Sequence, residues 1–355
     1  MKLGLGLYRS GLTDRNMRFA KQSGCSHVVA HLTDYFAGKD PEISSGDDMG
    51  WGVCEGAPHW TQEELDGLVA LARRNGLEVA GLENFNPAHW HDILLDGPAK
   101  HRQIEDLKQL VRRIGKAGIP VMGYNFSLAG VWGWTRGPYA RGGAASVGLD
   151  IAAIDPDRPI PKGMVWNMVY DKSAGPGHVP PVSEEELWQR IGWFLGEILP
   201  VAEECGVAMA CHPDDPPMEA LRGTARGINS PEKYERLVAM APSPANKLEL
   251  CLGSIQEMRD ADVYAVAERW ATAGRIGYIH FRNVKGQVPR YHEVFVDEGD
   301  IDMIRMMQVL QRAGYDGVLI PDHTPALDCD APWHAGMAFA LGYMRAAMQA
   351  IERQG

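Results

Sequence analysis

The chain has 355 residues, of which 45% are hydrophobic, and a formal net charge of −11 at neutral pH. An acidic chain lacks the basic face that a nucleic acid or an anionic membrane surface requires, and no apolar run approaches the ~20 residues of a membrane span. We therefore expect no nucleic-acid or membrane partner. The length fits one (β/α)8 barrel with insertions, or two ordinary domains.

The six cysteines are scattered along the chain and form no CxxC pair. This distribution is typical of reduced thiols rather than of a secreted disulfide framework. The first residues, Met1–Leu5, lack the long apolar stretch of a signal peptide. We expect a cytoplasmic protein.

Short apolar or β-branched runs alternate with amphipathic stretches along the whole chain. Serine or threonine precedes several of the amphipathic stretches, and glycine follows most of them, as is typical of helix ends. The predicted strands are 2–7, 26–31, 77–82, 120–125, 207–212, 247–251, 276–281 and 318–321. The predicted helices are 13–23, 61–75, 99–117, 183–205, 231–241, 255–273, 300–313 and 335–353.

Eight strand-then-helix units predict a parallel sheet, and their number favours a closed (β/α)8 TIM barrel spanning 1–355 as a single domain. A doubly wound open sheet is the alternative, but no GxGxxG motif opens the first helix. Two connections, 32–60 after the second strand and 127–182 after the fourth, are long and rich in Gly, Pro and Trp. We expect them to be ordered loops at one mouth of the barrel, the second serving as a lid or substrate wall.

Ligand-type residues end the last four predicted strands, at His212, Cys251, His280 and Asp322. They are separated by 39, 29 and 42 residues, which is one strand–helix unit each time. Strand ends of a barrel meet at one face, so two imidazoles, a thiolate and a carboxylate could hold one divalent transition metal. Cys211 should point the other way by strand alternation.

Each of these residues has a plainer explanation when taken alone. A strand-end histidine can be a hydrogen-bonded structural residue, Cys251 a small buried hydrophobe, and Asp322 the cap of a turn. The joint pattern at four consecutive strand ends favours the metal site.

Further side chains at the same mouth are candidates for binding or catalysis. Arg282 could hold a substrate carboxylate or form a surface ion pair, and His323 could transfer a proton or orient Asp322. Three prolines around Asp214 and Asp215 should hold that pair rigidly at the rim. The remaining candidates for substrate binding are Asn283, Tyr124, Asn125, Trp134 and Arg136.

The segments "CHPDDPP", "CLGS", "IHFRN" and "PDH" occur in this order and resemble the mannonate dehydratases of the hexuronate pathway. The segments "NPAHWHDILL" and "WGWTR" extend the resemblance, which covers roughly 80–345. It implies a cytoplasmic TIM barrel related to the xylose-isomerase-like group, and it hints at a dimer or larger homo-oligomer. It also implies a divalent metal, usually Mn²⁺, on the four strand-end residues; ligand chemistry alone leaves Fe²⁺, Co²⁺ and Zn²⁺ open.

The resemblance implies the dehydration of D-mannonate, a sugar acid, to 2-keto-3-deoxy-D-gluconate. This reaction removes the proton on C2 and expels the hydroxyl on C3, so one group accepts a proton and another donates one. The resemblance makes His323 one of that pair.

The chain departs from the family pattern near these residues. "PDHTP" replaces the family's "PDHGR", and His334 or Met337 falls near the place of a family tyrosine. We therefore take His334 as a further candidate catalytic residue. Asp214, held at the rim by the neighbouring prolines, is another.

Four functions remain open at this point. The first is a metal-dependent sugar-acid dehydratase, and the second is a metal-dependent sugar isomerase or epimerase, because both reactions pass through an enediol-like species. The third is a barrel that binds a sugar acid without turnover. The fourth is a structural fold without metal.

Overall fold

The computed structural model describes residues 1–35, 37 and 52–353. Eight parallel strands close into a barrel in the order β1-β17-β14-β13-β10-β5-β4-β2. These are the eight strands predicted from the sequence, so the closed barrel is confirmed over the open sheet. Their bounds are β1 Lys2–Leu7, β2 His27–Ala30, β4 Glu78–Glu83, β5 Val121–Tyr124, β10 Ala208–Cys211, β13 Asn246–Cys251, β14 Ile276–His280 and β17 Val318–Ile320.

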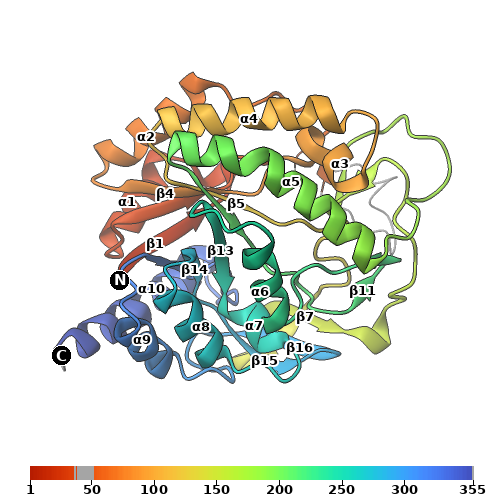
Figure 1. Ribbon diagram of the computed structural model, residues 1–355. Coiled ribbons are helices and arrows are strands. Elements are labelled where there is room, and N and C mark those ends of the chain that lie inside the picture. Colours follow the sequence, from red (N-terminus) through yellow and green to blue (C-terminus); the bar gives the residue numbers. More distant parts are fainter. Residues whose placement is uncertain (36, 38–51, 354–355) are drawn as a thin grey trace.

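Helices surround the barrel, and both chain ends lie on the side opposite the long connection 127–182 (Figure 1). The predicted starts of the helices 61–75 and 183–205 are confirmed, because the side chains of Thr61 and Ser183 each accept a hydrogen bond from the backbone three residues later. Among the described residues, no helix is long and apolar enough to cross a membrane. The helix bounds are α1 Asp14–Gln22, α2 Gln62–Arg74, α3 Pro87–Leu95, α4 Lys100–Lys116, α5 Glu184–Cys205, α6 Pro231–Met240, α7 Leu252–Glu257, α8 Val263–Thr272, α9 Met303–Arg312 and α10 Pro332–Glu352.

The helices of the structure differ from the prediction in two places. The stretch 255–273 is divided between α7 and α8, because Met258 is extended and Asp262 caps a new helix by accepting from the amides of Tyr264 and Ala265. Helix α3 was not predicted; Asn86 caps it and Pro87 occupies its first turn.

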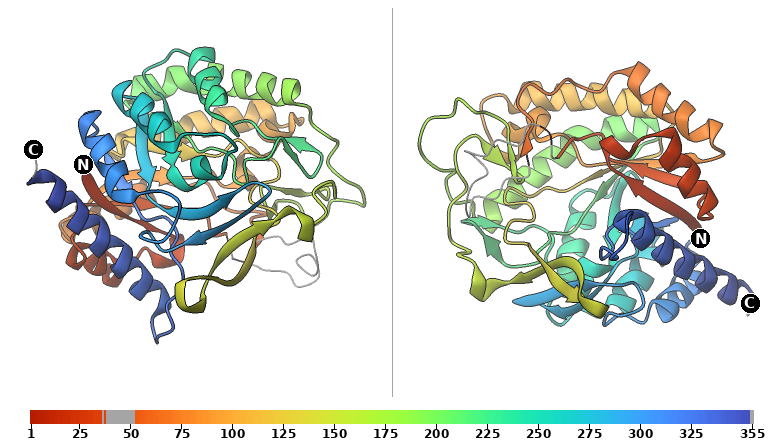
Figure 2. Two further views of the ribbon diagram at one scale, coloured as in Figure 1. Left: turned by 90° about the horizontal axis from the view of Figure 1, so that it is seen from below. Right: turned by 180° about the vertical axis from the view of Figure 1, so that it is seen from behind.

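The long connection 127–182 is ordered, as predicted, and it contains strands of its own. Two of its strands form an antiparallel sheet with a hairpin that follows β14, in the order β15-β16-β7-β6. Figure 2 shows the two hairpins side by side beyond the barrel. Most of the connection 32–60 lies outside the described residues. The additional strands are β3 Gly52–Val53, β6 Thr135–Ala140, β7 Ala144–Asp150, β8 Met164–Val165, β9 Met168–Val169, β11 Ala220–Leu221, β12 Thr224–Ala225, β15 Asn283–Gln287 and β16 Arg290–Val294.

Two hydrophobic clusters follow from the closed sheet. The larger one fills the space between strands and helices and includes Cys211, which points away from the barrel axis as predicted. The smaller one lies inside the barrel, where Val29, Val121 and Ile320 from different strands pack together. The polar strand ends above this inner cluster form the floor of the site.

Candidate active site

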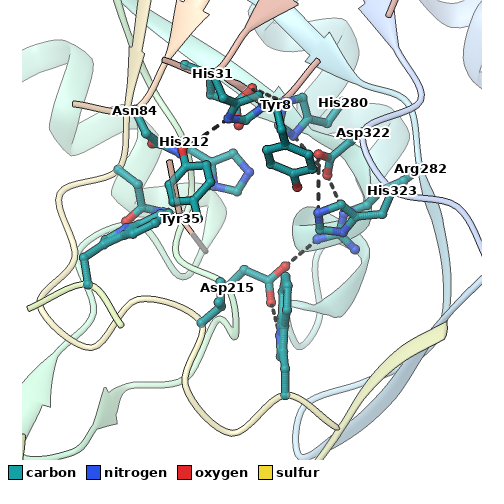
Figure 3. A pocket seen from close by; sticks show the side chains of 15 residues that line it. Tyr8, His31, Tyr35, Asn84, His212, Asp215, His280, Arg282, Asp322 and His323 are labelled. Carbon is teal, nitrogen blue, oxygen red and sulfur yellow. Dashed lines mark hydrogen bonds and ion pairs between the residues drawn. The ribbon is translucent and has the colours of Figure 1, made fainter. Parts of the chain in front are cut away.

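Donor side chains meet where four neighbouring barrel strands end. His212 follows β10, and Asp322 lies two residues beyond β17; Cys251 and His280 are the last residues of β13 and β14. Donor atoms of His212, Cys251 and His280 lie within 4.8 Å of one another. Asp322 Oδ2 lies 3.3 Å from His280 Nδ1. The structure thus brings together the four residues that the sequence singled out, and Figure 3 shows three of them around one pocket.

His212 has one ring nitrogen engaged by the backbone. Its Nδ1 lies 2.6 Å from the carbonyl oxygen of Pro213, which also accepts a hydrogen bond from the Asn125 side chain at 3.2 Å. A carbonyl oxygen can only accept, so Nδ1 carries the proton. Nε2 is therefore the His212 atom left to act as a ligand.

His280 lies among three carboxylates. Its Nε2 is 3.0 Å from Glu249 Oε1 and 3.2 Å from Glu83 Oε2, on the side away from Asp322. Burial lowers the pKa of His280, but Asp322, Glu83 and Glu249 outweigh this effect and raise it well above its usual value. Nε2 donates to the buried glutamates, so a cation would compete with a proton for Nδ1.

The interior of the barrel beneath His280 is polar, and a glycine makes room for it. A Cβ atom at Gly123 would lie 2.4 Å from both Glu249 Oε2 and the Tyr278 hydroxyl oxygen. Tyr278 donates a hydrogen bond to Glu83 at 3.2 Å. The four side chains Glu83, Glu249, Tyr278 and His280 therefore form one buried layer under the strand ends.

Cys251 is positioned by the start of α7. Its sulfur accepts the backbone amide of Ser254 at 3.5 Å, and the side chain is fully buried. Burial raises the pKa of the Cys251 thiol, but Arg282, His212 and His280 together bring it well below its usual value. A low thiol pKa supplies the thiolate that metal ligation requires.

His323 is held by a carboxylate from the unpredicted hairpin. Its Nδ1 lies 3.0 and 3.2 Å from the two carboxylate oxygens of Glu293, and its Nε2 lies 3.6 Å from Asp322 Oδ1. Burial lowers the pKa of His323, but Asp322 and Glu293 outweigh it and raise the value to about 9. Because Glu293 occupies Nδ1, Nε2 is the nitrogen available for proton transfer.

The donor set fits a divalent transition metal. His280 Nδ1 is buried and makes no hydrogen bond within the described residues, although a carboxylate oxygen of Asp322 is close to it. Two imidazoles, a thiolate and a carboxylate form a competent ligand set. A buried imidazole nitrogen such as His280 Nδ1 would lose free energy on burial without a partner, and a cation supplies that partner.

Arg282 lies at the centre of an ion-pair network rather than at the surface. It is 4% exposed, pairs with Asp215, and lies 2.8 Å from Glu257, 3.3 Å from Glu293 and 3.4 Å from Asp322. Four carboxylates from four different elements therefore surround one guanidinium. The positive charge of Arg282 is therefore already balanced by these carboxylates and is not available to bind a substrate carboxylate.

Asp215 likewise has partners on both of its carboxylate oxygens. It accepts hydrogen bonds from Tyr291 at 2.6 Å and Trp134 at 3.2 Å on Oδ1, and from Ser254 at 3.2 Å on Oδ2, which also meets Arg282. These partners fix the plane of the Trp134 ring at the pocket wall. Among the described residues, the lining consists of Tyr8, His31, Tyr35, Glu83, Asn84, Asn125, Val131, Trp134, Trp166, His212, Asp215, His280, Arg282, Asp322 and His323.

Asp214 and Tyr124 do not line this pocket, although both were expected in the site. Asp214 is buried in an ion pair with Arg226 at 3.2 Å and accepts the amide of Ile228 at 2.9 Å, so it has a structural partner. Tyr124 is in register with Cys211 and packs against Phe194 of α5. Residues in register point to the same side of a sheet, so Tyr124 faces the helices like Cys211.

Asn283, His334 and Arg136 also lie outside the pocket. Asn283 donates to two backbone carbonyls at 3.0 and 2.9 Å and fixes the segment after β16. His334 lies in the first turn of α10, where its Nε2 contacts Asn16 Oδ1 at 3.0 Å and its ring meets Phe19. Arg136 is exposed on β6, at a neighbouring cavity. A catalytic role for His334 does not fit its place against α1.

Several residues in or beside the pocket were not among the site residues predicted from the sequence. Glu249 stands two positions before Cys251 on the same strand. Period-two alternation places both side chains on the inner face, so the sequence alone could have indicated Glu249. Glu293 lies on a hairpin whose pairing with β7 is not encoded locally. Tyr8 and Tyr35 come from loops after β1 and β2, whose paths the sequence pattern does not define.

Comparisons with known proteins agree with this geometry. A family model described as D-mannonate dehydratase (UxuA) matches 53–167 and 177–354. The mannonate dehydratase of Streptococcus pneumoniae (strain 70585) is 34% identical over 279 residues, which cover 74% of each chain. The crystal structure of mannonate dehydratase from Streptococcus suis serotype 2 superposes with a TM-score of 0.77 at 27% identity, covering 100% of this chain and 95% of that one.

A structure of L-ribulose 3-epimerase shares the fold alone. It superposes with a TM-score of 0.59 at 14% identity, covering 99% of this chain and 96% of that one. The family match covers most of the chain, including all four strand ends that carry donor residues. The chain therefore belongs to the D-mannonate dehydratase family.

Proposed function

We propose that the protein is a metal-dependent hydro-lyase that converts D-mannonate to 2-keto-3-deoxy-D-gluconate and water. The observation that carries this proposal is the convergence of four donor side chains beside His323, in a chain of the D-mannonate dehydratase family. A divalent ion in this place would act as a Lewis acid toward the substrate carboxylate and the charge that develops beside it. Residues 1–355 act as one catalytic domain in this proposal.

In this proposal His212, Cys251, His280 and Asp322 hold the ion. The Pro213 carbonyl keeps the proton of His212 on Nδ1, while Glu249 and Glu83 accept the proton on Nε2 of His280. The two imidazoles are thereby oriented through opposite nitrogens, which fixes their rings before any ion arrives.

His323 transfers a proton through Nε2, because Glu293 holds its Nδ1. Dehydration requires one proton acceptor at C2 and one donor at the departing C3 hydroxyl. The pocket offers Tyr8 and His31 as the second group. Trp134 and Asn125 border the space and limit the positions that a substrate chain can take.

The proposed ion is Mn²⁺, on the strength of the family resemblance; the thiolate also suits Fe²⁺, Co²⁺ and Zn²⁺. We further propose a cytoplasmic homo-oligomer. Elemental analysis of the protein as purified identifies the ion. Light scattering on a sizing column measures the mass of the assembly.

The test is to remove metal with a chelator, restore Mn²⁺, add D-mannonate and follow the 2-keto-3-deoxy product. We expect product with Mn²⁺, none with the chelated protein, and none with Cys251→Ser. The absence of product under Mn²⁺, Fe²⁺, Co²⁺ and Zn²⁺ would contradict the proposal.

One observation favours a second candidate, a metal-dependent sugar isomerase or epimerase. Arg282 is neutralised by four carboxylates, so no guanidinium or ammonium group of the described pocket lining is left to bind a substrate acid, and the proposed ion would have to do so. An uncharged sugar would not need one. A screen of aldoses and ketoses beside aldonates, followed by NMR, separates the two: conversion of neutral sugars without loss of water identifies the isomerase.

A further inference from the structure

A second cavity opens from the pocket. The two cavities share Tyr8, Val131, Trp134, Asp322 and His323, so they meet on the side of the site where His323 lies. The second cavity extends from there between the β6–β7 hairpin and the start of α10. A molecule bound at the strand ends could therefore continue into it.

The lining of the second cavity combines aromatic faces with small polar groups. Trp134 and the half-buried Trp333 supply rings, and Met337 adds apolar surface. Ser146 and Thr324 add hydroxyl groups to the same wall. Flat aromatic surface beside hydroxyl groups suits a sugar ring, which has an apolar C–H face and hydroxyls around its edge.

The aromatic faces are held in place by their surroundings. The Trp134 ring nitrogen donates to Asp215 at 3.2 Å and to Tyr291 at 3.0 Å, so the ring cannot turn freely. Trp333 packs against Phe19 with ring centroids 6.0 Å apart. A rigid aromatic wall binds with little loss of side-chain entropy.

The proposed reaction leaves part of the substrate untouched. Dehydration breaks the C2–H and C3–O bonds, releases water, and leaves an enol that becomes the 2-ketone, so the oxygens on C4, C5 and C6 take no part. A substituent on one of these oxygens does not interfere with the bonds that change. It needs only space next to the reacting centre, and the second cavity provides that space.

We propose that the second cavity is a subsite for a second sugar ring, so that the substrate is a glycosylated aldonic acid. This inference rests on the proposed dehydration and names the substrate class for the same site. Trp134 and Trp333 flank the distal ring, and the strand-end residues receive the acid end.

The test compares D-mannonate with 4-O-β-D-mannosyl-D-mannonate, using the Mn²⁺-loaded protein. Calorimetry gives both dissociation constants, and detection of the 2-keto-3-deoxy product gives both values of kcat/KM. We expect the disaccharide acid to bind at least about 10-fold more tightly, a factor typical of one well-packed ring contact.

Variants on one helix then assign the preference to the cavity. Trp333→Ala should reduce the disaccharide preference about 10-fold, whereas Trp333→Phe should keep most of it. Phe339→Ala is the matched control, because Phe339 lies on the same helix and outside both cavities. Circular dichroism and metal content confirm that each variant is folded.

The outcomes separate this inference from the proposed function. Tight, Trp333-dependent binding of the disaccharide acid without dehydration of either acid supports the subsite and contradicts the hydro-lyase. Dehydration of mannonate without preferential binding of the disaccharide acid contradicts the subsite alone. Equal affinities, or an equal loss of both in Trp333→Ala, would also overturn the subsite.

Discussion

The strand ends and the loop-built wall of the second cavity differ in how they are determined. The strand-end donors lie at the last residues of regular elements or within two positions of them, and hydrogen bonds from their own surroundings fix their orientation. The wall instead depends on pairing between β7 and β16 and on the start of α10, which are far apart in the sequence. The wall of the second cavity can therefore change while the strand-end donors keep their chemistry.

The largest effect should come from breaking the donor set itself. Cys251→Ser removes the thiolate but preserves a small polar side chain at the start of α7. We expect metal affinity to fall by more than about 100-fold and turnover to be lost, since the loss of an outer-shell partner alone costs ~10–100-fold. Elemental analysis after dialysis measures the bound metal; full metal content would show that the sulfur is not a ligand.

A smaller effect should come from the buried layer beneath the donors. Glu249→Gln keeps the shape of the side chain but removes the carboxyl group that faces His280 Nε2 at 3.0 Å. We expect metal affinity to fall about 10-fold, because outer-shell carboxylates orient metal-bound histidines. A metal titration with a competing chelator measures this change. Unchanged affinity would assign the orientation of His280 to Glu83 alone.

A substitution at Asp214 tests whether Asp214 and its neighbour Asp215 have different roles. Asp214→Asn breaks the buried ion pair with Arg226, so we expect the free energy of unfolding to fall by about 3 kcal/mol. Metal content should stay the same, because Asp214 does not line the pocket. Urea unfolding gives the first quantity and elemental analysis the second. A stable variant that had lost its metal would place Asp214 in the site after all.

The smallest effect should come from His334. Its side chain contacts α1 rather than either cavity, so His334→Ala removes one partly buried hydrogen bond to Asn16. We expect kcat/KM for mannonate to change by less than about two-fold and stability to fall by about 1 kcal/mol. Steady-state kinetics and thermal unfolding measure these values. A large loss of kcat would restore the catalytic role first expected for His334.

The barrel and its strand ends could be predicted because local sequence patterns determine them. All eight barrel strands were located to within two residues, and the residues that end the last four strands were identified from type and spacing. Tyr124 was expected in the site, but its side chain faces the helices. Strand alternation had predicted that Cys211 faces outward, and Tyr124 is in register with Cys211 on the neighbouring strand. When the alternation of side chains is carried over from β10 to its neighbour β5, it places the Tyr124 side chain on the outer face of the barrel.

The remaining features could not be predicted because they depend on contacts between distant segments. The hairpin β15–β16 is stabilised by β7, some 140 residues earlier, and its polar sequence carries no strong strand signal of its own. The network around Arg282 likewise joins residues from four elements, so no single stretch indicates that the guanidinium is already neutralised.

The position of Arg282 has a consequence for how such a site can evolve or be redesigned. One guanidinium joins the end of β10, helix α7, strand β16 and the end of β17 through its four carboxylate neighbours. A loop transplanted from a relative without its own equivalent of Glu293 would leave His323 and Arg282 short of a partner. The hairpin is therefore not an independent module, and exchange of the substrate wall should be easiest at the start of α10, which lies outside this network.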